Sequence, residues 1–166
     1  MNDIKARFRE LAEHLKTKGK LLNIRPENYQ TDIVQFMLCP GGHNITPQGL
    51  YLANFRYRAS LYVERIAMPA AITLMIHARA WLDNNDDTRD KYKLADPEIS
   101  IIELDDGDLV DLLLTGEFID PVYLAPAPEG TPDAEIIEWN GRRYTVAEYD
   151  LWIAERGEVN GGPTDV

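Results

Sequence analysis

Residues 51–63 alternate between an apolar face and a mostly polar face, and this run is the strongest constraint on the fold. One face would carry the aromatic and aliphatic side chains Tyr51, Ala53, Phe55, Tyr57, Ala59, Leu61 and Val63. The other face would carry Leu52, Asn54, Arg56, Arg58, Ser60, Tyr62 and, just beyond, Glu64. A period of two indicates a strand with one buried and one partly hydrated face. At about 3.3 Å per residue the run reaches roughly 43 Å, so we expect part of it to project beyond the core as a hairpin arm.

Two segments have the periodicity of helices. In residues 3–18, apolar side chains recur every three or four positions, and Gly19 suits the residue after a helix. In residues 69–83, Pro69 is well placed in the first turn, and apolar side chains surround most of the circumference. A helix that is apolar nearly all round is expected to be buried against a sheet or a neighbour.

Further strands are expected at 32–38, 98–104, 109–114 and 118–124. The turn between the second and third of these is rich in aspartate and glycine, which favours a hairpin. Asn140-Gly141, between 136–139 and 142–145, is the strongest short hairpin signal in the chain. We therefore expect an α+β fold, with two main helices packed on an antiparallel or mixed sheet of four or five strands.

The Pro-rich stretch after residue 125 is the clearest internal boundary in the sequence. We expect a core domain over 1–125, a linker over 126–134 and a hairpin-helix appendage over 135–157. The helix of this appendage would span 146–156. The Gly-rich, polar residues 158–166 are expected to form a flexible tail.

Charge is distributed as a block. Between Lys93 and Arg142 there is no lysine or arginine, whereas these 48 residues carry 13 acids. Residues 1–93 sum to +4, and the whole chain to −11. Such a block builds a strong negative field, which repels nucleic acid and attracts cationic surfaces. The centre of this expected acidic face is formed by Asp105, Asp106, Asp108 and Asp111.

Composition narrows the class of protein further. Cys39 is the single cysteine, so no intrachain disulfide is possible and a reducing compartment is expected. The polar N-terminal segment is untypical of a signal peptide, and no apolar run approaches the roughly 18 residues of a membrane span. We expect no contact with a membrane.

Few residues point to chemistry. Cys39 and His43 could form half a metal site, but a structural zinc needs about four ligands. The aspartates of the 105–108 turn could suggest calcium, although Asp and Gly are also the ordinary residues of such a turn. No nucleophile stands in a recognisable motif. We expect no enzyme, no metal and no cofactor, and keep a small hydrolase with paired carboxylates as the least favoured alternative.

Basic and aromatic side chains on otherwise apolar elements suggest contacts between subunits. Arg56 and Arg58 could be a solvated face, or a basic ladder that meets the acidic block of another copy. The residues predicted at a subunit interface are Arg56, Tyr57, Arg58, Tyr62, Arg79 and Trp81. The 136–145 hairpin is predicted to dock a partner through Trp139, Arg142 and Arg143.

The order of these elements resembles a known family. A buried helix ends in Ala80-Trp81-Leu82-Asp83-Asn84-Asn85, and an apolar strand, an Asp-rich turn and a second strand follow over Ile99–Glu117. In both respects the chain is similar to the tail completion protein R family of contractile-tailed temperate phages. Gly116, between Thr115 and Glu117, departs from the family pattern.

The resemblance implies a structural tail terminator without catalytic residues. Such a protein would form a ring, expected to be a hexamer, that caps the head-proximal end of the tail tube and stops its polymerisation. Its partners would be the tube protein, the sheath protein and the head or neck connector. It would be assembled in the host bacterial cytoplasm and reside in the virion tail.

DNA would pass through such a ring without specific binding, because an acidic rim repels phosphate within a Debye length of about 8 Å. Two other functions stay open from the sequence. One is a neck or head–tail joining protein, and the other is an acidic DNA mimic that occupies a nucleic-acid-binding protein.

Overall fold

The computed structural model describes residues 6–105 and 107–147. The α-helices of this part of the chain are α1 (Arg7–Leu21), α2 (Met68–Asn85) and α3 (Thr88–Tyr92). Its strands are β1 (Tyr29–Pro40), β2 (Ile45–Thr46), β3 (Gly49–Ala67), β4 (Glu98–Glu103), β5 (Leu109–Pro126), β6 (Ile137–Trp139) and β7 (Arg142–Val146). The α+β class is confirmed. The predicted helix over 146–156, except its first two residues, the tail over 158–166 and Asp106 lie outside the described residues.

The strands of the described residues form one antiparallel sheet in the order β1-β3-β5-β7-β6. In addition, β2 pairs with β3 and β4 pairs with β5. These seven strands exceed the expected four or five, because β6 and β7 join the sheet. In the pairing of β7 with β5, Val146 lies opposite Leu124. The predicted 118–124 strand is not a separate element but the continuation of β5.

The chain forms two compact units, and each is described by itself. The helical unit comprises Arg7–Phe36 and Arg56–Ile119 and contains all three helices and β4. The hairpin unit comprises Met37–Phe55 together with residues 6 and 120–147, and contains β2, β6 and β7. The long strands β1, β3 and β5 each contribute residues to both units. The domain boundaries expected at the Pro-rich stretch stay a prediction.

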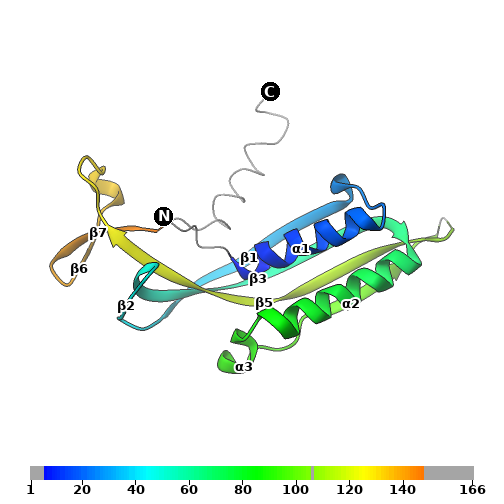
Figure 1. Cartoon of the computed structure of the whole chain (residues 1–166), viewed down its shortest axis with the longest axis horizontal. Helices are drawn as coiled ribbons and strands as arrows, with labels where there is room; N and C mark the ends of the chain where they lie inside the picture. Colours follow the sequence, from blue (N-terminus) through cyan, green and yellow to red (C-terminus); the bar gives the residue numbers. More distant parts are fainter. Residues whose placement is uncertain (1–5, 106, 148–166) are drawn as a thin grey trace. The chain divides into compact units, whose positions relative to one another are not determined.

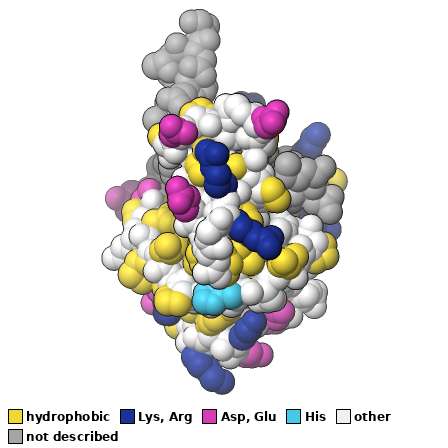
Figure 2. All heavy atoms as spheres, turned by 90° about the vertical axis from the view of Figure 1, so that its left-hand side faces the viewer, with side chains coloured by type: hydrophobic (Ala, Val, Ile, Leu, Met, Phe, Trp, Pro, Cys, Tyr) yellow, Lys and Arg dark blue, Asp and Glu magenta, His cyan; other side chains and the backbone are white. Residues whose placement is uncertain are grey.

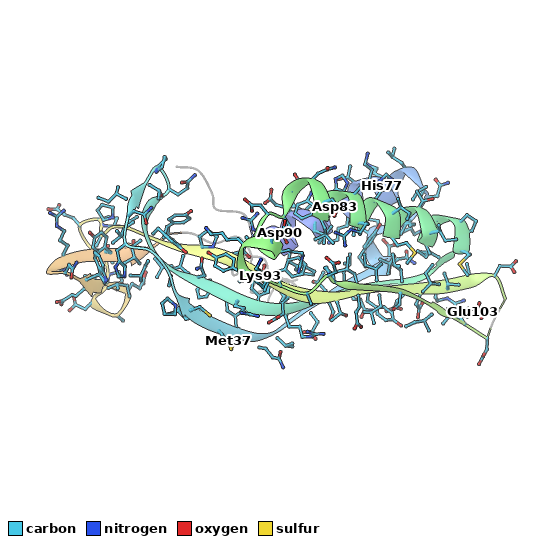
Figure 3. The ribbon with its side chains drawn as sticks, turned by 90° about the horizontal axis from the view of Figure 1, so that it is seen from below. Met37, His77, Asp83, Asp90, Lys93 and Glu103 are labelled. Atoms are coloured by element: carbon cyan, nitrogen blue, oxygen red, sulfur yellow. The ribbon has the colours of Figure 1, made fainter. Side chains whose placement is uncertain are left out.

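In the helical unit, α1 and α2 lie side by side on one face of the sheet (Figure 1). Figure 3 shows that, among the described residues, the opposite face of the sheet carries no helix there. The core between the layers is aromatic at its centre. The Phe118 ring lies 5.4 Å from the Phe8 ring and 6.0 Å from the Tyr57 ring, measured between centroids. These contacts join α1, β3 and β5.

Strand β3 confirms the alternation read from the sequence. Tyr57, Ala59, Leu61 and Val63 are buried at every second position. Arg65 interrupts the pattern because its φ of 53° lies in the left-handed region, which non-glycine residues rarely adopt. This local irregularity changes which side chains face inward, so the next buried residue is Ile66.

Helix α2 is covered on one side only. Pro69 lies in its first turn, as predicted, and the buried side chains are Ala71, Leu74, Ala78, Trp81 and Leu82. Ile72 and Ile76 lie on another side and are 47% and 62% exposed. The sequence predicted burial nearly all round this helix. Among the described residues, only one face of α2 is buried. The short helix α3 was not anticipated from the sequence.

Two tight turns shape the hairpin unit. Asn140 and Gly141, with φ of 49° and 73°, join β6 to β7, which confirms the hairpin predicted from this dipeptide. Gly49 follows the turn after β2 with a φ of 129°. A Cβ at this position would lie 2.5 Å from the backbone oxygen of Leu124, so the close approach of β3 to β5 requires glycine.

Candidate assembly surfaces

The hairpin formed by β4 and β5 carries the exposed part of the acidic block. Asp105 and Asp108 are exposed in the turn, and Glu98 and Glu103 are exposed at the ends of β4. Figure 3 shows Glu103 at the tip of the hairpin. The turn and β4 contain no basic residue. This end of the helical unit therefore presents a negative edge to solvent.

Asp111 differs from the other predicted acids because it is buried and bonded within the chain. Its Oδ2 accepts a hydrogen bond from the Tyr62 hydroxyl at 2.6 Å, and its Oδ1 accepts one from the Arg65 backbone N–H at 2.9 Å. The first of these bonds raises the pKa of Tyr62, because the neighbouring carboxylate disfavours the phenolate. Asp111 thus holds the irregular backbone at Arg65, and Tyr62 is part of the same contact.

The uncovered face of the helical unit's sheet carries a polar row along β3 and β5. Arg56 donates two hydrogen bonds to Glu117, at 3.0 and 3.1 Å. This bidentate contact lowers the pKa of Glu117. Ser60 and Thr115 also pair through their hydroxyls, at 3.2 Å. Arg58 is exposed on this face. The expected basic ladder thus consists of one arginine with a partner in its own chain and one exposed arginine.

Two other predicted interface residues belong to the interior. Tyr57 is 1% exposed and Trp81 is 9% exposed in this chain. Both pack in the helical unit, where Tyr57 stacks with Phe36 at 5.3 Å between ring centroids. Arg79 is partly exposed and forms ion pairs with Asp83 and Asp96. Any role of these side chains in a subunit interface stays a prediction.

A buried ion pair links the end of α2 to β5, and sequence reasoning missed it. Arg89 Nε lies 3.3 Å from Asp86 Oδ2, and neither side chain is more than 8% exposed. Arg89 also donates to the backbone oxygens of Ala95 at 2.8 Å and Glu117 at 2.7 Å. Its guanidinium lies 4.9 Å from the Phe118 ring centroid. Burial lowers the pKa of Arg89.

Histidines from the two long helices meet at the α1–α2 contact. The rings of His14 and His77 lie 6.2 Å apart in an edge-to-face arrangement. Burial, followed by the nearby charges of Lys18 and His77, lowers the pKa of His14. The arrangement therefore favours the neutral form of His14 near pH 7.

The hairpin unit presents a mixed surface. The Trp139 ring lies 5.4 Å from the His43 ring, which joins the β6–β7 hairpin to the loop after β1. Arg142 and Arg143 are exposed, and Arg143 forms an ion pair with Asp133 at 4.0 Å. Figure 2, which views the side where β6 and β7 are drawn in Figure 1, shows basic and acidic side chains interspersed among apolar ones. A role of this hairpin in docking stays a prediction.

The described residues contain no cluster of three His, Cys, Asp or Glu side chains able to hold a metal ion. Cys39, the cysteine considered for a half-site, is a free, partly buried thiol. Across residues 6–105 and 107–147, no helix combines the length and apolarity that a membrane crossing requires.

Comparison with known families identifies the class of protein that these surfaces serve. The profile of the P2 phage tail completion protein R (GpR) family matches residues 6–147. This match covers all described residues and includes both units. Comparisons with curated proteins and with solved structures gave no significant match.

The protein is a structural component of a phage tail, whose interactions are with other tail components. More particularly, the chain belongs to the P2 phage tail completion protein R family.

Proposed function

We propose that this tail completion protein is a tail terminator. Copies of the chain form a closed ring, a hexamer, on the head-proximal end of the tail tube. The ring stops polymerisation of the tube and offers a face to the sheath and to the head or neck connector. It assembles in the host cytoplasm and remains in the virion. Family membership supports the role in tail completion.

The observation that carries the proposal is the segregation of charge in the helical unit. Exposed acids gather along β4 and its turn, where no base accompanies them. On the ring's inner rim, Asp105 and Asp108 repel DNA that passes through, because phosphates and carboxylates carry charge of the same sign. Asp106 of the same turn belongs to this rim by sequence.

The β6–β7 hairpin is the part that we assign to docking. The exposed Arg142 and Arg143 suit an acidic partner surface, and Trp139 supplies an aromatic anchor. On this proposal, the hairpin contacts the tube, the sheath or the neck, and the 1–125 core builds the ring.

Removing the protein during phage assembly tests the proposal. Electron microscopy of particles that lack the protein should show tubes of uncontrolled length without attached heads. Supplying the wild-type chain should restore uniform tails that carry heads. Tubes of normal length joined to heads in its absence would contradict the terminator role.

DNA binding tests the acidic rim. The wild-type ring should not retard DNA in a gel at physiological salt. The double variant Asp105→Lys, Asp108→Lys adds positive charge at the turn and should retard it, whereas Asp105→Asn, Asp108→Asn should not. If the lysine variant assembles but does not bind DNA, these residues do not face the pore.

A further inference from the structure

In the described part of the chain, the sheet of the helical unit ends at the two edge strands β1 and β4. Its strands lie in the order β1-β3-β5-β4, and among the described residues no strand lies beyond β1 on one side or beyond β4 on the other. An edge strand offers backbone groups to another strand and is a template for pairing between chains. The regular stretches of the two edge strands have the same length. Six residues form β4, and six residues of β1 precede the left-handed Gln35.

The strand directions permit the sheet to continue from one copy to the next. Strand β4 runs antiparallel to β5. Contacts of Gln30 with Glu64 and of Phe36 with Tyr57 place β1 antiparallel to β3. Across four alternating strands, the first and last run in opposite directions. The β1 strand of a second copy beside β4 therefore extends the antiparallel sheet and keeps the helices of both copies on one face.

Charge disfavours the symmetric alternative, in which β4 pairs with β4 of another copy. That seam would bring together Glu98, Glu103 and the turn acids of two chains, and β4 and its turn contain no base. Like charges opposite one another destabilise a pair of strands. The acids thus disfavour a twofold contact between two β4 strands. The β4 edge is therefore expected to pair with a different surface of the second copy.

The flank of α1 beside β1 supplies the complementary charge. The Tyr29 hydroxyl donates to the Leu15 backbone oxygen at 3.2 Å, and the Lys16 ammonium lies 6.0 Å from the centre of the Tyr29 ring. Lys20 lies on the same flank, one turn beyond Lys16. The charged residues of this edge are Arg9, Glu13, Lys16, Lys20, Arg25, Glu27 and Asp32. Their sum is positive by one charge, whereas β4 and its turn contain acids and no base.

Each of the two edges carries an exposed apolar side chain on the face away from the helices. Ile102 is 41% exposed and lies opposite Asp111, on the face away from the helices. Val34 is 45% exposed and, four residues after Gln30, lies on the same face as Glu64. Pairing the six regular residues of β1 in a second copy antiparallel to β4 places Gln30 opposite Ile102 and Val34 opposite Glu98, all on the same side of one continuous sheet.

We propose that copies of this chain associate head to tail through their sheet edges, with β4 of one copy adding to β1 of the next. Such a heterologous contact generates a ring where the rotation closes. This inference rests on the proposed ring function and specifies the surfaces that form the ring.

Cysteine cross-linking tests the contact in the full chain. In a Cys39→Ala background, the double variant Gln30→Cys, Ile102→Cys should give a covalent ladder up to the ring size with a short bismaleimide reagent, because these positions lie opposite each other across the seam. Each single variant should stay uncrosslinked. The matched control Ile72→Cys, Ile76→Cys, with both thiols exposed on α2, should give no cross-links between chains, because the reagent can bridge these two positions only within one helix.

Native mass, measured on the same samples, separates failure of the contact from failure of the ring. An oligomer without the Gln30–Ile102 ladder overturns edge pairing and leaves the ring intact. Cross-linked dimers from the Ile102→Cys single variant would also overturn it, because they report β4–β4 pairing. A monomer, both alone and with the tube protein, overturns the ring and with it this inference.

A pair of variants that differ only in sign provides a second test. Val34→Asp adds an acid to the edge that faces β4, and we expect the dissociation constant of the oligomer to increase roughly fivefold or more. Val34→Lys replaces the same apolar side chain with a base, which the acids of β4 attract. Its oligomer should therefore form at low salt and dissociate as salt is added. Equal dissociation by both variants, independent of salt, would overturn the electrostatic part of the proposal.

Discussion

The helical and hairpin units are built from the same long strands but are stabilised differently. Of the 27 buried apolar side chains among the described residues, 22 lie in the helical unit and five in the hairpin unit. In the first, helices cover a sheet face and side chains interlock. In the second, paired strand ends and tight turns predominate. We infer that the helical unit supplies most of the stability of the protein, because it holds most of the buried apolar side chains.

Truncating one aromatic side chain in each unit should give the largest difference between the units in the free energy of unfolding. Phe118→Ala removes a ring that contacts Phe8, Tyr57 and Arg89, and should lower the free energy of unfolding by about 3–5 kcal/mol. Trp139→Ala removes a half-buried ring that contacts His43, and should cost about 1 kcal/mol. Urea denaturation followed by circular dichroism measures both values. Equal losses would contradict the division of stability between the units.

The buried ion pair is the next most sensitive point of the helical unit. Asp86→Ala leaves Arg89 buried without its carboxylate and removes the acceptor of the Thr88 backbone N–H, so we expect a loss of about 3–5 kcal/mol. Asp83→Ala breaks an exposed pair with Arg79 and serves as the matched control, with little expected change. A similar small effect of both variants in denaturant titrations would show that Asp86 is dispensable.

Variants of two aspartates in the acidic block should separate an effect on folding from an effect on assembly. Asp111→Ala removes the acceptor of the Arg65 N–H and should destabilise the isolated chain by about 1–3 kcal/mol. Asp108→Ala, at an exposed position, should leave unfolding unchanged and alter only the salt dependence of the oligomer. Unfolding curves and native mass at several salt concentrations measure the two effects. If Asp111→Ala changes the oligomer but not the free energy of unfolding, Asp111 acts in assembly and not in folding.

The smallest effect is expected from His14 at the α1–α2 contact. Because burial lowers its pKa in the folded protein, the unfolded chain binds the proton more readily, and stability should fall as pH decreases through 6.5 towards the folded pKa. His14→Gln should flatten this slope, whereas His43→Gln, in an exposed loop of the hairpin unit, should retain it. Thermal unfolding between pH 5 and pH 8 tests this pair. A steeper slope in His14→Gln would contradict the assignment.

Local patterns were sufficient to predict the elements of the fold. The alternation over 51–63 identified β3, Asn140-Gly141 identified the β6–β7 hairpin, and Pro69 marked the first turn of α2. These features depend on neighbours within a few residues. The joining of β7 to β5 depends on chain segments about twenty residues apart, and no local pattern reports it.

The candidate surfaces were less predictable because exposure depends on distant partners. The charge pattern placed Asp111 with exposed acids, but Tyr62, 49 residues away, covers it. The Asp86–Arg89 pair is close in sequence, yet its burial arises from contacts with β5, including that of Arg89 with Glu117. The one available signal was Asp86-Asp87-Thr88-Arg89, an acid and a base one helical turn apart at a helix start.

Native mass spectrometry of the purified chain, with and without the tail tube protein, tests the central claim most directly. The account predicts one closed species at a fixed multiple, six, of the 18.9 kDa chain. The species should dissociate as ionic strength rises, because complementary charge supports the contact. A monomer under all conditions, or a dimer that withstands salt, would contradict head-to-tail assembly through the edges of the helical unit.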